Sequence, residues 1–155
     1  MEPFFKTYDE MIGDLIERID GIFSDLPDEA LDWTPDPALN TLTVLIVHSM
    51  GALRYWVGQM LGGEDVQRDR EAEFDADGYS KAELHDLLSE TQTKVTTVLD
   101  GLTMANLDSK SYSPMHKDYF TGRFALAHAL EHTALHVGHM EITRELWEQF
   151  DWDRE

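Results

Sequence analysis

Residues 127–140 read A-H-A-L-E-H-T-A-L-H-V-G-H-M and carry four of the chain's seven histidines, at positions 128, 132, 136 and 139. On a helix that turns 100° per residue, these four imidazoles project within an arc of roughly 80°. Large apolar residues project onto the same arc, namely Phe124, Leu135, Ile142 and Leu146. This pattern predicts that the histidines face the core. A buried imidazole needs a polar partner, because an unpaired buried polar group costs about 1–3 kcal/mol.

Three further helical patterns precede this stretch. Apolar residues at helical spacing predict helices over about residues 2–23, from Asn40 to about Leu61, and from Ser80 to about Gly101. The histidine stretch belongs to a fourth helix, predicted from Thr121 to about Gln149. Ser80 and Glu83 form a capping box, and Gly62-Gly63 stops the second helix. Strand alternation is absent. We therefore expect an all-α four-helix bundle, formed by residues 1–155 as a single domain, in which sites form between facing helices.

The connections between these helices are long. Residues 24–40 hold three prolines and cannot form one helix, although Pro27-Asp28-Glu29 could open a short turn. Residues 64–79 are acidic and polar, which predicts an exposed loop. Residues 103–120 form a second long connection, and loops of such length are often functional.

Composition restricts the chemistry and the partners. The chain has no cysteine, which excludes disulfides, iron–sulfur clusters, thiolate-bound zinc and cysteine nucleophiles. The formal charge of −19 disfavours nucleic acid and anionic membranes as partners. There is no basic-then-apolar N-terminal signal and no apolar run of about 18 residues. We therefore expect a cytoplasmic protein with a small-molecule substrate, in which nitrogen and oxygen hold any metal.

His132 and His136 lie one helical turn apart, about 6 Å along the axis, so that both can bind one ion. A third ligand should come from another helix, and His48 is the best candidate because it lies within the apolar stretch T-V-L-I-V-H-S-M-G. Taken alone, His48 also fits a hydrogen-bonded core histidine. A buried histidine network without metal is therefore an alternative.

The other histidines fit less well as ligands. A triad of His128, His132 and His136 is geometrically poor, because its outer members are about 12 Å apart. His128 and His139 could instead contact a ligand or a substrate. We expect His85 and His116 to be ordinary surface or loop residues. The zinc-protease motif is absent, since Thr133 stands where that motif has glutamate.

An isolated histidine in the second helix, followed by H-x-x-x-H-x-G-H in the fourth, resembles the DinB-like (YfiT-like) superfamily. Thr121-Gly122-Arg123 and Arg144-Glu145-Leu146, on either side of the histidines, extend the likeness to essentially the whole chain. The resemblance implies a divalent metal, most often zinc or nickel, with iron or manganese as alternatives. The resemblance implies, by position, that the ligands of this metal are His48, His132 and His136, although some relatives have glutamate at the position of His132.

The resemblance also implies candidate reactions. Characterised members include S-transferases that use a low-molecular-weight thiol such as bacillithiol, mycothiol or glutathione. The alternatives are a metal-dependent hydrolase and a non-catalytic metal-binding or stress-response domain. Three histidines leave a position open on a tetrahedral ion for water or a thiolate. Arg123 could bind a cofactor carboxylate, and Glu131 and His139 are further candidates for catalytic roles.

Aromatic residues suggest a pocket and an interface. Six of them could line a pocket above the metal: Trp33, Tyr55, Trp56, Tyr112, Tyr119 and Phe120. Trp147 and Trp152 lie near the C-terminus, where an exposed aromatic side chain could serve a dimer interface. The family resemblance implies a homodimer.

Overall fold

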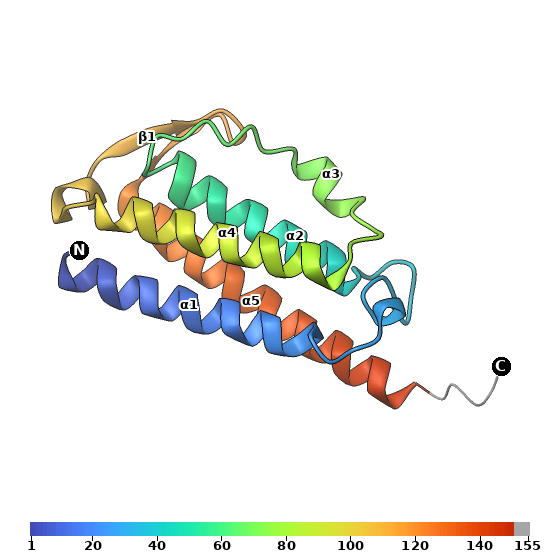
Figure 1. The fold of residues 1–155 in the computed structure, drawn as a ribbon. Coiled ribbons are helices and arrows are strands. Elements are labelled where there is room, and N and C mark those ends of the chain that lie inside the picture. Colours follow the sequence, from blue (N-terminus) through green and yellow to red (C-terminus); the bar gives the residue numbers. More distant parts are fainter. Residues whose placement is uncertain (151–155) are drawn as a thin grey trace.

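The computed structural model describes residues 1–150. Its long helices are α1 (Pro3–Phe23), α2 (Leu42–Leu53), α4 (Lys81–Asp100) and α5 (Gly122–Gln149). Both α1 and α2 pack against both α4 and α5, so the order around the bundle is α1, α4, α2, α5. Helices α1 and α5 run in one direction, and α2 and α4 run in the other (Figure 1). The predicted four-helix bundle is therefore confirmed.

Helix α2 continues directly into the π-helical turn η2 (Arg54–Gln59). The connections contain short elements: η1 (Asp28–Ala30), α3 (Arg70–Phe74), η3 (Met104–Leu107), and the hairpin strands β1 (Lys110–Ser113) and β2 (Asp118–Thr121). The predicted turn after Pro27 is η1. Residues 64–79 are predicted to form an exposed loop; most of them are exposed, but they include the short helix α3, in which Glu73 is buried. Residues 103–120 likewise contain η3 and an antiparallel hairpin. Strands of four residues are too short to show a clear alternation in sequence.

Side chains accept hydrogen bonds from free backbone N–H groups at the starts of α2, α4 and α5. The predicted capping box at Ser80 is confirmed, and the Thr121 side chain accepts a hydrogen bond from the N–H of Phe124. Helix α2 begins at Leu42 and not at the predicted Asn40, because Thr41 caps it: Thr41 Oγ1 accepts the hydrogen bond from Val44 N at 3.1 Å. The second helical stretch ends at Gly62-Gly63 as predicted, and Gly63 has the positive φ of 69° that glycine tolerates best.

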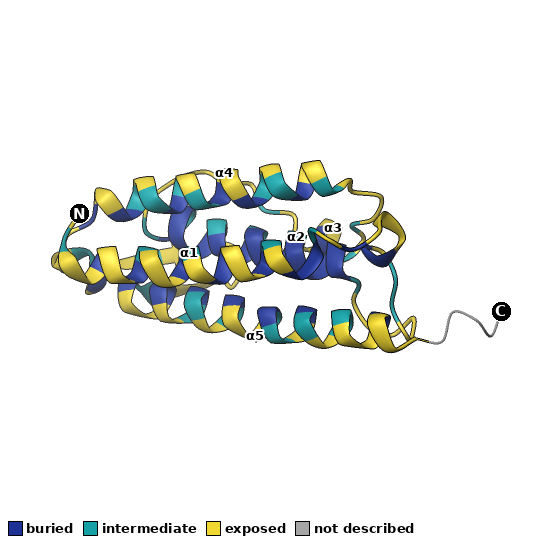
Figure 2. Cartoon of the chain, turned by 60° about the horizontal axis from the view of Figure 1, so that its bottom comes forward, coloured by how far each residue is buried: buried dark blue, intermediate teal, exposed yellow. Residues whose placement is uncertain are grey.

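The core lies between the four long helices, and Figure 2 shows buried residues along their inner sides. Helix α1 contributes one continuous apolar face, which includes Phe5, Ile12 and Ile19, all fully buried. Tyr8 belongs to the same face, and its hydroxyl donates a hydrogen bond to the carbonyl oxygen of Leu126 at 2.9 Å. This bond joins α1 to α5 close to the start of both helices.

The predicted orientation of α5 is wrong for its large apolar residues. Phe124, Leu135, Ile142 and Leu146 are 44%, 52%, 56% and 39% exposed. The core side of α5 is formed by smaller or more flexible residues: Ala125, Leu126, Ala129, Thr133, Val137 and Met140. These lie about a quarter turn from the centre of the histidine arc. Apolar residues occur on two sides of this helix, so their periodicity does not identify the buried side.

Trp147 is buried, at 9% exposure, and its ring packs on Trp33. It is therefore not the exposed aromatic side chain expected for a dimer interface, and Trp152 lies outside the described residues. Within residues 1–150, no helix combines the length and the apolarity needed to cross a bilayer.

Replacing Tyr8 with Phe is expected to lower the free energy of unfolding by about 0.5–1.5 kcal/mol, because one buried hydrogen bond is lost without creating a cavity. The matched control is Tyr119→Phe, since Tyr119 is 64% exposed and should change stability little. Urea denaturation followed by circular dichroism measures both changes. Equal effects for the two variants would contradict the role given to the Tyr8 hydroxyl.

Candidate metal centre

Three histidines from two helices come together where α2 packs against α5. His48 projects from α2, and His132 and His136 lie one turn apart on α5. The Nε2 atom of His132 is 3.1 Å from Nε2 of His48 and 3.2 Å from Nε2 of His136. One nitrogen from each ring lies within 4.8 Å of the others. The structure thus assembles the three residues that the sequence singled out.

The spacing of these nitrogens fits a metal ion. Zinc binds imidazole nitrogen at about 2.0–2.1 Å, so two nitrogens of a tetrahedral site lie about 3.3–3.4 Å apart. The observed 3.1 and 3.2 Å are close to that value. Without a metal, a single proton can lie between each pair of nitrogens, and the remaining lone pairs face one another. One cation satisfies all three donors at the same time.

Burial keeps two of the imidazoles neutral. Desolvation, reinforced by the neighbouring imidazoles, lowers the pKa of His132 to about 3. Desolvation, followed by the proximity of His48 and His139, lowers the pKa of His136 to about 4. Neutral imidazoles offer the lone pairs that a metal requires. The Nδ1 atom of His132 is buried and has no hydrogen-bond partner among the described residues.

His48 is buried, at 4% exposure, and its Nδ1 atom lies 2.9 Å from Oε2 of Glu73 on α3. Burial opposes ionisation of Glu73, but the hydrogen bonds from Arg68 and His48 outweigh it and lower the pKa of this carboxyl. Sequence reasoning missed Glu73 and Arg68, because both lie in a segment that reads as an acidic loop. A weak signal was present, since Asp69 is a good N-cap for a short helix there.

The other histidines surround this centre or lie apart from it. The Nδ1 atoms of His139 and His136 are 3.3 Å apart. His128 packs beside His132 with ring centres 5.7 Å apart, and its Nδ1 is 3.4 Å from a carboxylate oxygen of Glu131. His85 pairs with Asp20 at the surface, as expected of an ordinary residue.

An aromatic cluster flanks His132, formed by Trp56, His116, Phe120, Phe124 and His128. Of the six aromatic residues expected near the metal, Trp56 and Phe120 belong to it. Tyr55 hydrogen-bonds Ser113 and also packs on Trp56 and His116 at the edge of the cluster. Tyr112 packs on Tyr119 in the hairpin, and Trp33 packs on Trp147. His116 is a loop residue, but it also contacts Trp56, and burial lowers its pKa.

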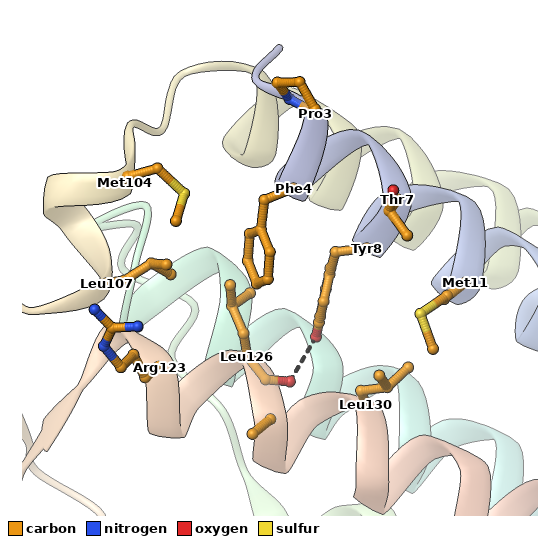
Figure 3. Close-up of a pocket in the computed structure, with 11 residues that line it drawn as sticks. Pro3, Phe4, Thr7, Tyr8, Met11, Met104, Leu107, Arg123, Leu126 and Leu130 are labelled. Carbon is orange, nitrogen blue, oxygen red and sulfur yellow. Dashed lines mark hydrogen bonds between the residues drawn. The ribbon is translucent and has the colours of Figure 1, made fainter.

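Arg123 lies away from the three histidines. Its Nε donates a hydrogen bond to Asp108 at 2.8 Å, and its side chain borders an apolar cavity of about 640 Å³ between α1, η3 and α5 (Figure 3). None of the three histidines lines this cavity. By contrast, His139 borders a cavity of about 250 Å³ that also includes Leu45 and Ile142, from the two helices that carry the triad. The structure therefore places His139, and not Arg123, beside the candidate centre.

Comparisons with known proteins agree with this fold. A family described as the DinB superfamily matches residues 12–140. A conserved protein from Enterococcus faecalis has a similar structure, with a TM-score of 0.72 and 18% identity over 94% of this chain and 97% of that one. YfiT from Bacillus subtilis is described as a probable metal-dependent hydrolase with an unusual four-helix bundle topology. It gives a TM-score of 0.73 and 16% identity over 96% and 90% of the two chains.

A DinB-like protein from Bacillus subtilis gives a TM-score of 0.62 and 18% identity over 95% of this chain and 90% of that one. No protein with a curated description matches the chain. At identities below 20%, these three similarities show the fold that the proteins share.

The depressed pKa values predict an acid-sensitive metal-free protein. Because burial lowers the pKa of His132 to about 3 and that of His136 to about 4 in the folded chain, against 6.5 for a free histidine, the unfolded chain binds more protons between those values. The free energy of unfolding should therefore fall as the pH is lowered from about 6.5 to about 4. Replacing both residues with Gln should make that fall shallower, as measured by urea denaturation in chelator. His85→Gln is the control, and an equal slope in wild type and the double variant would refute this explanation.

Proposed function

This chain belongs to the DinB superfamily, and from that premise we propose that it is a divalent-metal-dependent hydrolase with His48, His132 and His136 as the metal ligands. The observation that carries the proposal is the convergence of three Nε2 atoms, with separations of 3.1 and 3.2 Å. Imidazole donors favour zinc or nickel, with iron or manganese as alternatives, over magnesium and calcium, which prefer oxygen ligands.

An ion with three protein ligands retains an open position and supplies Lewis-acid activation of water or of a substrate carbonyl. In the reaction, water adds to the carbonyl carbon of an ester or amide, and the alcohol or amine leaves with a proton. The description of YfiT as a probable metal-dependent hydrolase supports the same reaction class for this chain. His139 is exposed and contacts His136, which suits it to transfer protons between the site and solvent.

The surroundings of the site favour a substrate with an apolar substituent. Phe120, Phe124 and His128 stack in sequence, with ring centres 4.9 and 5.5 Å apart, and His128 in turn contacts His132. Phe124 is 44% exposed, so this row of rings begins at the surface. An aromatic or aliphatic group packed on these rings would lie beside the converging nitrogens.

Thiol S-transfer is a second candidate, supported by Arg70. Its guanidinium lies 4.9 Å from the centre of the Phe74 ring, and that ring is 4.6 Å from the ring of His48. An exposed guanidinium at this place could bind the carboxylate of a small thiol such as glutathione or bacillithiol. Because the chain has no cysteine, such a cosubstrate would supply the sulfur, whose thiolate attacks an electrophilic carbon and displaces its leaving group.

Elemental analysis of protein purified without a metal-affinity tag tests the ligand set. We expect about one equivalent of zinc, nickel, iron or manganese per wild-type chain, and loss of the metal in His136→Ala. The matched control is His128→Ala, which changes a neighbouring histidine outside the triad and should retain the metal. No metal in the wild type, together with an unchanged melting temperature after zinc or chelator is added, would refute the metal site.

Activity assays then separate the candidate reactions. Metal-loaded protein is assayed for hydrolysis of p-nitrophenyl acetate and p-nitrophenyl butyrate. It is assayed separately for conjugation of glutathione to an aryl halide. If the chain is a hydrolase, His136→Ala should lower ester turnover by about 100-fold or more, because a bound ion contributes several kcal/mol to transition-state stabilisation. Thiol conjugation without ester turnover would favour the second candidate. A stably bound metal with neither activity would favour a non-catalytic metal-binding domain.

A further inference from the structure

Glu73 is a buried carboxylate that contacts His48 on the side of the ring opposite the converging nitrogens. The side chains of Arg68 and Glu73 are only 5% and 8% exposed. Arg68 donates from Nε to Oε1 at 2.6 Å and from Nη2 to Oε2 at 2.7 Å, and this second oxygen also accepts the bond from Nδ1 of His48. The bidentate contact fixes the position of the carboxylate, and the guanidinium keeps it ionised.

Gly51 makes this contact possible. It lies on α2 one turn after His48, and a Cβ atom added there would lie 2.1 Å from Oε1 and 2.8 Å from Cδ of Glu73. Any larger residue would force the carboxylate to move. The neighbouring Phe74 packs on the ring of His48 with centres 4.6 Å apart. Two consecutive residues of α3 thus hold the same imidazole, one at its edge and one against its face.

We propose that Glu73, oriented by Arg68 and accommodated by Gly51, is a positioning residue that fixes His48 in the Nδ1–H tautomer with the Nε2 lone pair directed at the metal. The inference rests on the metal site proposed above. Glu73 acts through His48 and does not bind the ion itself, because its carboxylate lies against Nδ1, across the ring from Nε2. Hydrogen bonds of this kind set the tautomer and raise the basicity of a ligating histidine.

The tautomer is measured first, in protein that contains no metal. In ¹⁵N-labelled wild type at mildly alkaline pH, long-range ¹H–¹⁵N correlation spectra should show the proton of His48 on Nδ1. The test variant is Arg68→Met/Glu73→Met, which removes both charges together, since replacing a buried ion pair with apolar residues of similar size is often tolerated. In this variant the Nδ1–H preference should disappear. If the wild-type tautomer persists in the double variant, the proposal is overturned.

Zinc affinity is measured next, by competition with a chromophoric chelator. Loss of the carboxylate in the Arg68→Met/Glu73→Met variant should weaken zinc binding by about 10- to 100-fold. The matched control is Lys6→Met/Glu10→Met, which removes an exposed ion pair on α1 with side chains 70% and 62% exposed. This control should bind zinc as tightly as the wild type.

Gly51→Ala provides an independent variant that retains both charges. The new methyl group should displace the Glu73 carboxylate and weaken zinc binding by about 10-fold or more, although alanine is the better helix former. Gly21→Ala is its control, because an added Cβ at this position of α1 meets nothing within 4 Å.

The outcomes separate the two proposals. If the wild type binds zinc and both test variants bind it as tightly as their controls, the positioning role of Glu73 is refuted and the metal site stands. If the wild type binds no metal, the proposed function fails, and the tautomer measurement still decides whether Glu73 orients His48. Weaker binding in both test variants, together with the change of tautomer, supports the positioning role.

Discussion

The close packing of α2 against α5 is the contact on which the candidate metal centre depends. Helices approach closely only where the side chains between them are small. The buried side of α5 presents Ala125, Ala129 and Thr133, and across this contact His48 of α2 comes within 3.1 Å of His132. Because the helical repeat places His136 one turn further on, two donors from α5 and one from α2 meet at a single point.

Burying the charged side chains of Arg68 and Glu73 beside this contact costs free energy, which argues that the pair has a role other than stabilising the bundle. Arg68 and Glu73 are removed from water almost completely, and an apolar pair of similar size is often as stable or more so. Their geometry is also specific, since Gly51 leaves space for the Glu73 carboxylate and Phe74 packs on the imidazole ring of His48 that this carboxylate contacts. A short helix in a polar connection is therefore better explained by the orientation of His48 than by the stability of the bundle.

The residues that could be predicted from the sequence are those whose type is rare in their surroundings. A histidine within an apolar helix, such as His48, is conspicuous, and so is a histidine pair at a spacing of four. Glu73 is one of 31 acidic residues, and nothing local distinguishes it from its exposed neighbours. Its burial arises from a tertiary contact with α2. The buried face of α5 cannot be read from its sequence for a related reason: Leu135 and Ile142 are apolar but exposed, whereas the residues that face the core are mostly small.

The exposure of these apolar residues also explains how the candidate site can be both accessible and well ordered. His132 and His136 lie between the buried and exposed sides of α5, so they are only half-buried. This burial is enough to lower their pKa values and keep their lone pairs free for a metal. Exposed Phe124 lies towards one end of the histidine row, and the cavity bordered by His139 and Ile142 lies towards the other. If all the apolar residues of α5 lay in the core, His132 and His136 would be buried with them and no substrate could reach the site.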